Sequence, residues 1–307
     1  MDPNEKIPVI FDTDIGSDID DTWALTFLLK SPELKPKLIL TETGNTTYRA
    51  KIVAKILERS GYSEIPVGIG MPQSDDAGPQ QPWVENYDIS DYPGTIYENG
   101  VNALIETIMG SPEPITLICT GPLTNIAAAL EIEPKIASKA RFVGMHGCLY
   151  KRPPGYGGGD DGVVPEYNVK ADPRACMKVF SAPWDVTITP LDTCGFVRLK
   201  GERYRRILEC EDRLVRDLME NYKIWLKSRD KDWLETFKTQ SSILYDTVAV
   251  YLAFSEELLV VRDLGVKVTE DGYTLVSEEA RKIHCAIEWK NLEAFKDLIV
   301  ERLTGQG

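Results

Sequence analysis

Histidine is scarce in this chain, which has only two, His146 and His284, among its 307 residues. The six cysteines include no Cys-x-x-Cys pair. Because zinc sites in proteins draw mainly on histidine and cysteine, a zinc enzyme is disfavoured. The cysteines are instead expected to be reduced and mostly buried thiols.

Long apolar runs are also missing, and no stretch approaches the roughly 18 residues that a membrane helix needs. The N-terminal residues MDPNEKIPVIFD are charged and lead directly into a strand-like segment, unlike a secretory signal. Together with the expected reduced cysteines, these absences predict a cytoplasmic protein.

Positive charge is in short supply, with 35 Lys and Arg against 48 Asp and Glu and a net charge of -13. An acidic surface repels phosphate backbones and anionic lipids, so we expect neither nucleic acid nor a membrane as a partner. A small neutral or cationic substrate, or one held with a metal ion, fits better. Solubility alone is the simpler explanation of the charge.

Short apolar runs rich in Val and Ile alternate with helical patterns. The predicted strands are 8–11, 38–41, 65–69, 115–119, 142–145, 186–189, 266–269, 273–276 and 283–287, with antiparallel edge strands between 260 and 276, and the predicted helices are 22–30, 50–59, 124–130, 211–229, 242–254 and 292–303. This alternation indicates an α/β fold with a mostly parallel central sheet covered by helices on both faces. Without a repeat or a break in composition, residues 1–307 are expected to form a single domain.

Two long polar loops, 71–97 and 147–165, interrupt this pattern. Loops of this length in a compact domain are usually functional lids or disordered segments. Aromatic residues favour lids, because disordered segments carry few of them. Trp83, Tyr87, Tyr156 and Tyr167 are candidates for stacking on a flat ligand, and ordinary packing is the alternative.

Five carboxylates lie within ten residues where the first predicted strand ends and a helix begins: Asp12, Asp14, Asp18, Asp20 and Asp21. Ligands bind outside the carboxyl ends of parallel strands. Like charges this close must be solvated, partly protonated or neutralised by a cation. Helix capping explains one or two of these carboxylates, but not all of them. An all-oxygen site suits calcium or magnesium, and a site open to substrate hydroxyls suits the flexible coordination of calcium better.

The segment Asp12 to Asp21 resembles the N-terminal signature Asp-x-Asp-Pro-Gly-x-Asp-Asp-Ala of the inosine-uridine preferring nucleoside hydrolase family. Ile15 replaces the proline, and two extra residues precede the aspartate pair. Four further motifs are similar to the family's and occur in its order: Thr43-Gly44-Asn45, Thr120-Gly121-Pro122-Leu123-Thr124-Asn125, Glu166-Tyr167-Asn168 followed by Asp172-Pro173, and Tyr245-Asp246. One motif alone is weak, but the five in order cover most of the chain.

The resemblance implies a calcium-dependent enzyme that cleaves the N-glycosidic bond of ribonucleosides. Carried over residue by residue, Asp14, Asp21, Asp246 and the carbonyl oxygen of Thr120 would bind Ca²⁺, with Asp14 also the general base. The implied substrate contacts are Asp20, Asn45, Glu166 and Asn168 on the ribose hydroxyls. Apart from the resemblance, Met145, Tyr167 and Trp83 are further candidate substrate contacts. Relatives are usually homodimers or homotetramers, so a homo-oligomer is expected.

These residue types suit the chemistry. N-glycosidic cleavage develops positive charge on the sugar, as in glycoside hydrolysis. Carboxylates stabilise that charge more than they stabilise the neutral ground state. Buried polar groups that hydrogen-bond a ribose reject deoxyribose, because losing the hydroxyl leaves them unpaired.

The sequence departs from the family at the group that protonates the leaving base. The family's histidine before the last aspartate is Tyr245 here, which could donate a proton, stack on the base or simply pack. His146, directly after a predicted strand, is the other candidate acid. Asp160 lies near a position where the family has an asparagine that reaches the 5′ end of the sugar.

Two other functions compete with this prediction. A magnesium-dependent phosphohydrolase of the haloacid dehalogenase class also opens with Asp-x-Asp, but it does not explain Glu166-Tyr-Asn168 or Tyr245-Asp246. A noncatalytic ribose- or nucleoside-binding protein on the same scaffold is left open by Tyr245, although the acidic cluster argues against it. Turnover of a ribonucleoside in the presence of calcium distinguishes the enzyme from such a noncatalytic binding protein.

Overall fold

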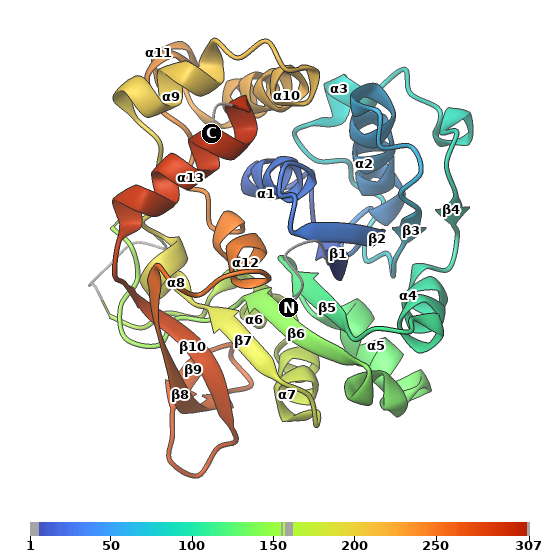
Figure 1. The fold of residues 1–307 in the computed structure, drawn as a ribbon, viewed down its shortest axis with the longest axis vertical. Helices are drawn as coiled ribbons and strands as arrows, with labels where there is room; N and C mark the ends of the chain where they lie inside the picture. Colours follow the sequence, from blue (N-terminus) through green and yellow to red (C-terminus); the bar gives the residue numbers. More distant parts are fainter. Residues whose placement is uncertain (1–5, 155, 157–161, 306–307) are drawn as a thin grey trace.

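The computed structural model describes residues 6–154, 156 and 162–305, and ten strands within them form one sheet (Figure 1). Its order is β4-β3-β2-β1-β5-β6-β7-β10-β8-β9. The strands are β1 (Ile7–Thr13), β2 (Leu34–Thr41), β3 (Val67–Ile69), β4 (Ile96–Tyr97), β5 (Ile115–Cys119), β6 (Ala140–Met145), β7 (Val186–Thr189), β8 (Leu259–Val268), β9 (Thr274–Val276) and β10 (Lys282–Trp289).

The sheet is mostly parallel, which confirms the predicted fold class. All strand pairs from β4 to β10 are parallel, and only β8 and β9 run antiparallel to their neighbours. The predicted antiparallel edge is present as β8 and β9. β10 lies between them and β7, because it pairs with both β7 and β8.

Helices cover both faces of the sheet (Figure 1). One face packs against α1 (Asp20–Leu29), α2 (Thr46–Ser60), α10 (Arg213–Arg229), α12 (Thr247–Leu252) and α13 (Leu292–Thr304), and the other against α4 (Gly100–Gly110), α5 (Thr124–Ile132) and α7 (Pro173–Ser181). The remaining helices are α3 (Gln81–Val84), α6 (Tyr167–Ala171), α8 (Leu191–Cys194), α9 (Gly201–Leu208), α11 (Trp233–Thr239), η1 (Ile89–Asp91) and η2 (Pro134–Ser138). Two apolar cores result because strand side chains alternate between the faces, as Phe11 and Ile10 of β1 do.

Several helices escaped the sequence analysis. The helical pattern was expected over 242–254, but α12 spans only Thr247–Leu252, and α4, α7 and α9 were not predicted. Among the described residues, no helix is both long and apolar enough to span a membrane.

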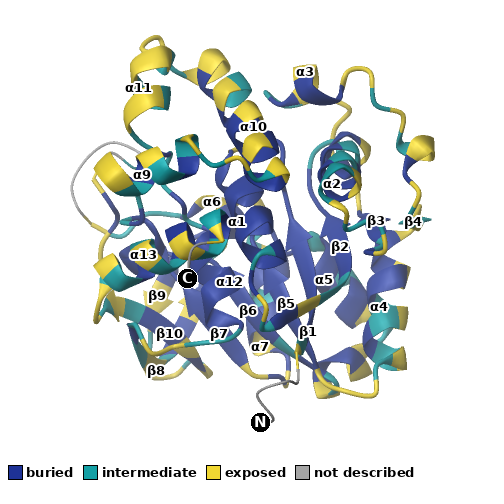
Figure 2. Ribbon diagram, turned by 45° about the horizontal axis from the view of Figure 1, so that its top comes forward, coloured by how far each residue is buried: buried dark blue, intermediate teal, exposed yellow. Residues whose placement is uncertain are grey.

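Helix α1 is buried along its whole length (Figure 2). It packs against α10, α12 and α13, so even its apolar outer side is covered. The two residues that open it, Asp20 and Asp21, are therefore buried carboxylates. The loop that leads into α1 turns at Gly16, whose φ is +106°, a conformation that side chains other than glycine rarely adopt. An added Cβ there would come within 2.8 Å of the Tyr48 ring.

Candidate functional site: an acidic cavity at the strand ends

A cavity of about 340 Å³ opens at the carboxyl ends of the central strands. Its lining residues are Asp14, Ser17, Asp18, Asp20, Asp21, Thr120, Met145, Tyr156, Glu166, Tyr167, Asn168, Arg229, Tyr245 and Asp246. These residues come from distant parts of the chain. They meet because β1, β5 and β6 lie side by side and end at the same edge of the sheet. Eleven of the candidate residues from the sequence meet here, Tyr156 among them.

A larger hollow of about 920 Å³ lies at the opposite end of the strands, around Pro8 and Arg141. Among the described residues, its charged side chains include no group of three that could hold a metal ion together. The chemistry of the lining, and not the volume, therefore makes the smaller cavity the candidate functional site.

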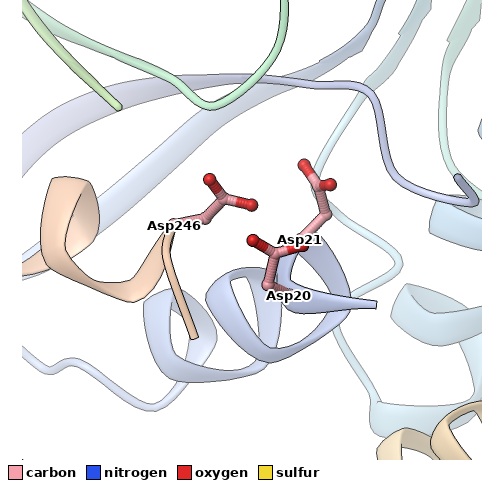
Figure 3. Close-up of side chains that lie close together, drawn as sticks. All are labelled: Asp20, Asp21 and Asp246. Atoms are coloured by element: carbon pink, nitrogen blue, oxygen red, sulfur yellow. The ribbon is translucent and has the colours of Figure 1, made fainter. Parts of the chain in front are cut away.

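Three carboxylates face one another in this cavity (Figure 3). Asp20 and Asp21 open helix α1, and Asp246 immediately precedes α12. One oxygen of each lies within 4.8 Å of the others, and all three residues are buried. They form the only such group of ligating side chains found in the described part of the chain.

Burial, followed by the mutual repulsion of the aspartates, raises the pKa of Asp20 and Asp246 well above the ordinary value of 3.8. Burial, followed by the charge of Asp14, raises that of Asp21 in the same way. Two hydroxyls offset part of this effect, since Thr13 and Thr120 donate to Asp21 Oδ1 at 2.5 and 2.9 Å. The negative charge of these buried carboxylates must therefore be neutralised by bound protons or by a cation.

Asp14 lines the same cavity from the end of β1, although it is not one of the three clustered carboxylates. The Ser17 hydroxyl donates to Asp14 Oδ2 at 3.0 Å, which orients the carboxylate. The buried guanidinium of Arg49 holds the backbone here, donating to the carbonyl oxygens of Asp14, Ile15 and Thr43. The position of the Asp14 carboxylate is thus fixed by Ser17 and by the contacts of Arg49 with the backbone of the same loop.

Glu166 and Asn168 form the opposite wall and are held by the main chain. Glu166 caps α6 and accepts from the backbone N–H groups of Asn168, Gly147 and Val169. Burial raises its pKa to about 7 in spite of these bonds. The Asn168 side-chain amide donates to the carbonyl oxygens of Thr120 and Met145 at 2.9 and 3.0 Å. Its Oδ1 is therefore the atom left to accept from a ligand.

Three tyrosines complete the lining. The rings of Tyr156 and Tyr245 meet edge to face with centroids 6.1 Å apart. The Tyr156 hydroxyl accepts from the backbone N–H of Tyr167, whose side chain is 55% exposed. Burial, and then the charge of Asp20, raises the pKa of Tyr245. These rings offer apolar faces to a planar group, but Tyr245 is a weak acid at neutral pH.

Two predicted substrate contacts lie outside the cavity lining. Asn45 caps helix α2, accepting from Tyr48 N at 2.9 Å and donating to Asp75 O. Trp83 belongs to α3, where Lys55 lies 4.6 Å from the ring centroid and the indole N–H donates to Glu220 of α10. The side chains of Asn45 and Trp83 thus form hydrogen bonds within the protein, away from the cavity. Asp160, another predicted substrate contact, lies outside the described residues.

His146 is also absent from the cavity lining, although it directly follows β6. Its fully buried ring lies between Phe142 and Phe180 on the opposite face of the sheet, and its Nε2 is 3.0 Å from the Gly121 carbonyl oxygen. Burial lowers its pKa to about 4. This placement gives no support to its predicted role as the acid for the leaving base, so we leave it out of the proposed catalytic groups.

Replacing His146 with leucine should lower the free energy of unfolding by about 1–3 kcal/mol, because the bond to Gly121 is lost. The pH profile of kcat/KM should keep its shape, since the ring does not reach the cavity. Chemical denaturation and initial rates at several pH values measure both effects. His284→Asn, on an exposed strand position, is the control and should change stability by less than about 0.5 kcal/mol. If His146→Leu instead removes the acidic or the basic side of the pH profile of kcat/KM, His146 takes part in catalysis.

Four residues of the site escaped the sequence analysis as functional positions. Ser17, Asp18 and Arg229 line the cavity, and Arg49 fixes the loop beside it. Asp18 stood out only as part of the acidic run. Arg229 was predicted only as the end of a helix, and nothing in its sequence neighbourhood signals that α10 reaches the loop after β1.

The whole chain resembles known nucleoside hydrolases in sequence. The inosine-uridine preferring nucleoside hydrolase family matches residues 9–301. A pyrimidine-specific ribonucleoside hydrolase, RihA from Citrobacter koseri, is 30% identical over 291 residues, covering 87% of this chain and 86% of that protein. RihA from Escherichia coli O127:H6 is 28% identical over 292 residues, with the same coverage.

Solved structures share the fold. A plant nucleoside hydrolase, PpNRh1, superposes with a TM-score of 0.79 at 24% identity, covering 98% of this chain and 99% of its own. The inosine-uridine preferring nucleoside hydrolase from Bacillus anthracis gives a TM-score of 0.76 at 21% identity, covering 97% and 99%. At these identities the structures speak for the fold alone.

Proposed function

Since this chain belongs to the inosine-uridine preferring nucleoside hydrolase family and is thus an N-glycosyl hydrolase, we propose that it hydrolyses ribonucleosides to ribose and free base with the help of Ca²⁺. The observation that carries the proposal is the convergence of Asp20, Asp21 and Asp246 in one cavity with Asp14. A phosphohydrolase of the haloacid dehalogenase class and a noncatalytic binding protein are set aside by the family match.

The donor set fits a calcium ion. Its side-chain donors are carboxylate oxygens, and the raised pKa values of the clustered aspartates mark a site where positive charge is needed. We propose Asp14, Asp21, Asp246 and the Thr120 carbonyl oxygen as ligands. Asp20 lies in the same group, where it can accept from a ribose hydroxyl. A bound Ca²⁺ would grip the 2′- and 3′-hydroxyls and make a coordinated water more acidic.

The chain's own residues supply the remaining chemistry. Asp14 takes a proton from the attacking water, and the Ser17 hydroxyl fixes the orientation of its carboxylate. Glu166 and the Oδ1 of Asn168 hold hydroxyls at the other end of the sugar. As the glycosidic bond breaks, the surrounding carboxylates stabilise the positive charge that develops on the ribose. Met145, Tyr167 and Tyr245 pack against the substrate from the remaining wall.

We further propose that the protein works in the cytoplasm as a homodimer or homotetramer. All six cysteines are free thiols, and five of them are buried, as expected for a reducing compartment. Size-exclusion chromatography with light scattering measures the number of copies, and a monomeric mass would contradict the second part of this proposal.

A panel of ribonucleosides, scored for free ribose with and without a chelator, tests the proposed function. We expect release of ribose that stops with chelator and returns with calcium. The matching 2′-deoxyribonucleosides should react at least about 1,000-fold more slowly, because the buried carboxylates lose a hydrogen-bond partner. Hydrolysis that is equally fast with excess chelator would contradict the calcium proposal. The absence of ribose release from every ribonucleoside would contradict the proposed substrate class.

A further inference from the structure

The charges that line the cavity are strongly unbalanced. Six lining residues are carboxylates: Asp14, Asp18, Asp20, Asp21, Glu166 and Asp246. Arg229 is the only cationic side chain among the described lining residues. Such a site suits a sugar that becomes positively charged, but it repels any group that departs with negative charge. Among the described side chains that line the cavity, Arg229 is the one that can offset this repulsion.

Arg229 is held at the last turn of α10, facing the loop that carries Asp14. Its guanidinium donates to the Ser17 carbonyl oxygen at 3.1 Å and lies 5.9 Å from the centre of the Trp225 ring. The Trp225 indole N–H donates to the same carbonyl oxygen at 3.3 Å. Arginine carries five N–H donors, and within the described part of the chain only this one hydrogen bond is formed. The guanidinium is thus oriented and still has donors for a ligand.

Asp18 lies beside Arg229 in the two-residue extension of the loop. Its backbone neighbour Ile19 donates to Asp18 Oδ1 at 2.8 Å, which fixes the carboxylate, and the charge of Arg229 acts on it. The extension therefore brings an oriented acid into the cavity whose only cationic lining side chain, among the described residues, is Arg229.

Cleavage of the glycosidic bond needs help at the leaving base. Both electrons of the C–N bond go to the base nitrogen and spread to an exocyclic carbonyl oxygen when the base has one. His146 is buried on the other face of the sheet, and burial, followed by the charge of Asp20, opposes the ionisation of Tyr245. Neither is well placed to supply a proton. A fixed cation can stabilise the departing electron pair without transferring one.

We propose that Arg229 stabilises the departing base, donating hydrogen bonds to a carbonyl oxygen on which negative charge develops. This inference rests on the proposed function. The C1′–N bond breaks with its electron pair on the base, water adds to C1′, and Asp14 takes the proton from that water. The base is then protonated by solvent after the bond has broken. The favoured substrates are ribonucleosides whose base carries a carbonyl group conjugated with the glycosidic nitrogen, such as uridine.

The test compares Arg229→Gln with the wild type on two substrates. Uridine has a poor leaving group, whereas p-nitrophenyl β-D-ribofuranoside releases a stable anion that needs little assistance. For Arg229→Gln we expect kcat on uridine to fall roughly 10- to 100-fold, less than for an enclosed donor because the side chain is exposed. On the nitrophenyl riboside kcat should change less than about threefold, because its leaving group is already stable. Arg229→Lys keeps the positive charge but loses the forked N–H donors of the guanidinium. Its kcat on uridine should lie between those of the wild type and Arg229→Gln.

Trp225→Phe is the matched control, because it removes the other hydrogen bond to the Ser17 carbonyl and leaves the cation in place. It should behave like the wild type on both substrates. If Arg229 only anchors the loop, Arg229→Gln will lose the same factor on both substrates and Trp225→Phe will show a related loss; that result overturns the inference. A wild-type rate on uridine for Arg229→Gln overturns it as well. In both cases ribose release by the wild-type enzyme leaves the proposed function standing, whereas its absence removes the proposed function.

Discussion

Replacing Asp14 with alanine should lower kcat by about a thousandfold or more, the largest effect expected of any single substitution in this protein. Asp14 is proposed both as the base that takes the proton of water and as a calcium ligand, so two contributions are lost together. The Ser17 hydroxyl and the Arg49 guanidinium also donate to the Asp14 carbonyl oxygen, which alanine keeps, and the rest of the cavity should therefore keep its shape. Initial rates of ribose release at saturating calcium measure the effect.

Asp14→Asn separates the two contributions. Asparagine keeps an oxygen that can bind calcium but cannot take a proton, so kcat should stay low while calcium still raises the melting temperature. Asp76→Asn, an exposed change in the loop after β3, is the control for the loss of one charge and should leave the rate unaffected. Near-normal turnover by Asp14→Ala would remove its assignment as the base.

The acidic wall of the cavity could be predicted from sequence because its residues follow buried strands. Asp14 directly follows β1 and Thr120 directly follows β5, and in a parallel sheet the ends of neighbouring strands meet at one edge. Asp246 comes from far along the chain, and only the resemblance to a family associated it with them. The local sequence pattern alone identifies only the site residues that directly follow β1 and β5.

His146 shows how strand geometry could have corrected one prediction. Successive side chains of a strand point to opposite faces. Met145 lines the cavity, and the residue after it therefore points away, into the aromatic cluster of Phe142 and Phe180. A position directly after a strand is not sufficient, because the alternation decides which of two neighbouring residues faces the cavity.

Other features depend on contacts that no local pattern reports. Asn45 follows a glycine, as the family motif requires, yet its side chain is used to cap α2 and to hold Asp75. Trp83 lies in a long polar loop but packs on α10 through Glu220. Arg229 reaches the cavity only because α10 crosses the loop after β1, a contact between segments more than 200 residues apart.

Removing calcium should abolish most turnover and make the protein's stability depend strongly on pH. We expect chelation to lower kcat by about a hundredfold or more. At 100 times its dissociation constant, calcium should stabilise the fold by about 2.7 kcal/mol, or roughly 5 °C in melting temperature for a chain of this size. Thermal melts and rates with chelator, and with calcium added back, measure both. Magnesium added back in place of calcium is the control for ion identity, and full recovery with it would contradict the choice of calcium.

The direction of the pH effect follows from the pKa shifts of Asp20, Asp21 and Asp246. Their folded-state pKa values lie well above the ordinary 3.8 of the unfolded chain, so the folded protein holds their protons more tightly. The stability that this tighter binding provides is complete below the ordinary pKa and is lost as the pH rises through the raised values. Without metal, the melting temperature should therefore fall as the pH rises from about 4 to 8. Calcium replaces the protons and should flatten this fall, and Asp246→Asn should reduce it in the metal-free protein. A metal-free protein whose melting temperature rises over the same range would show that these aspartates do not face one another.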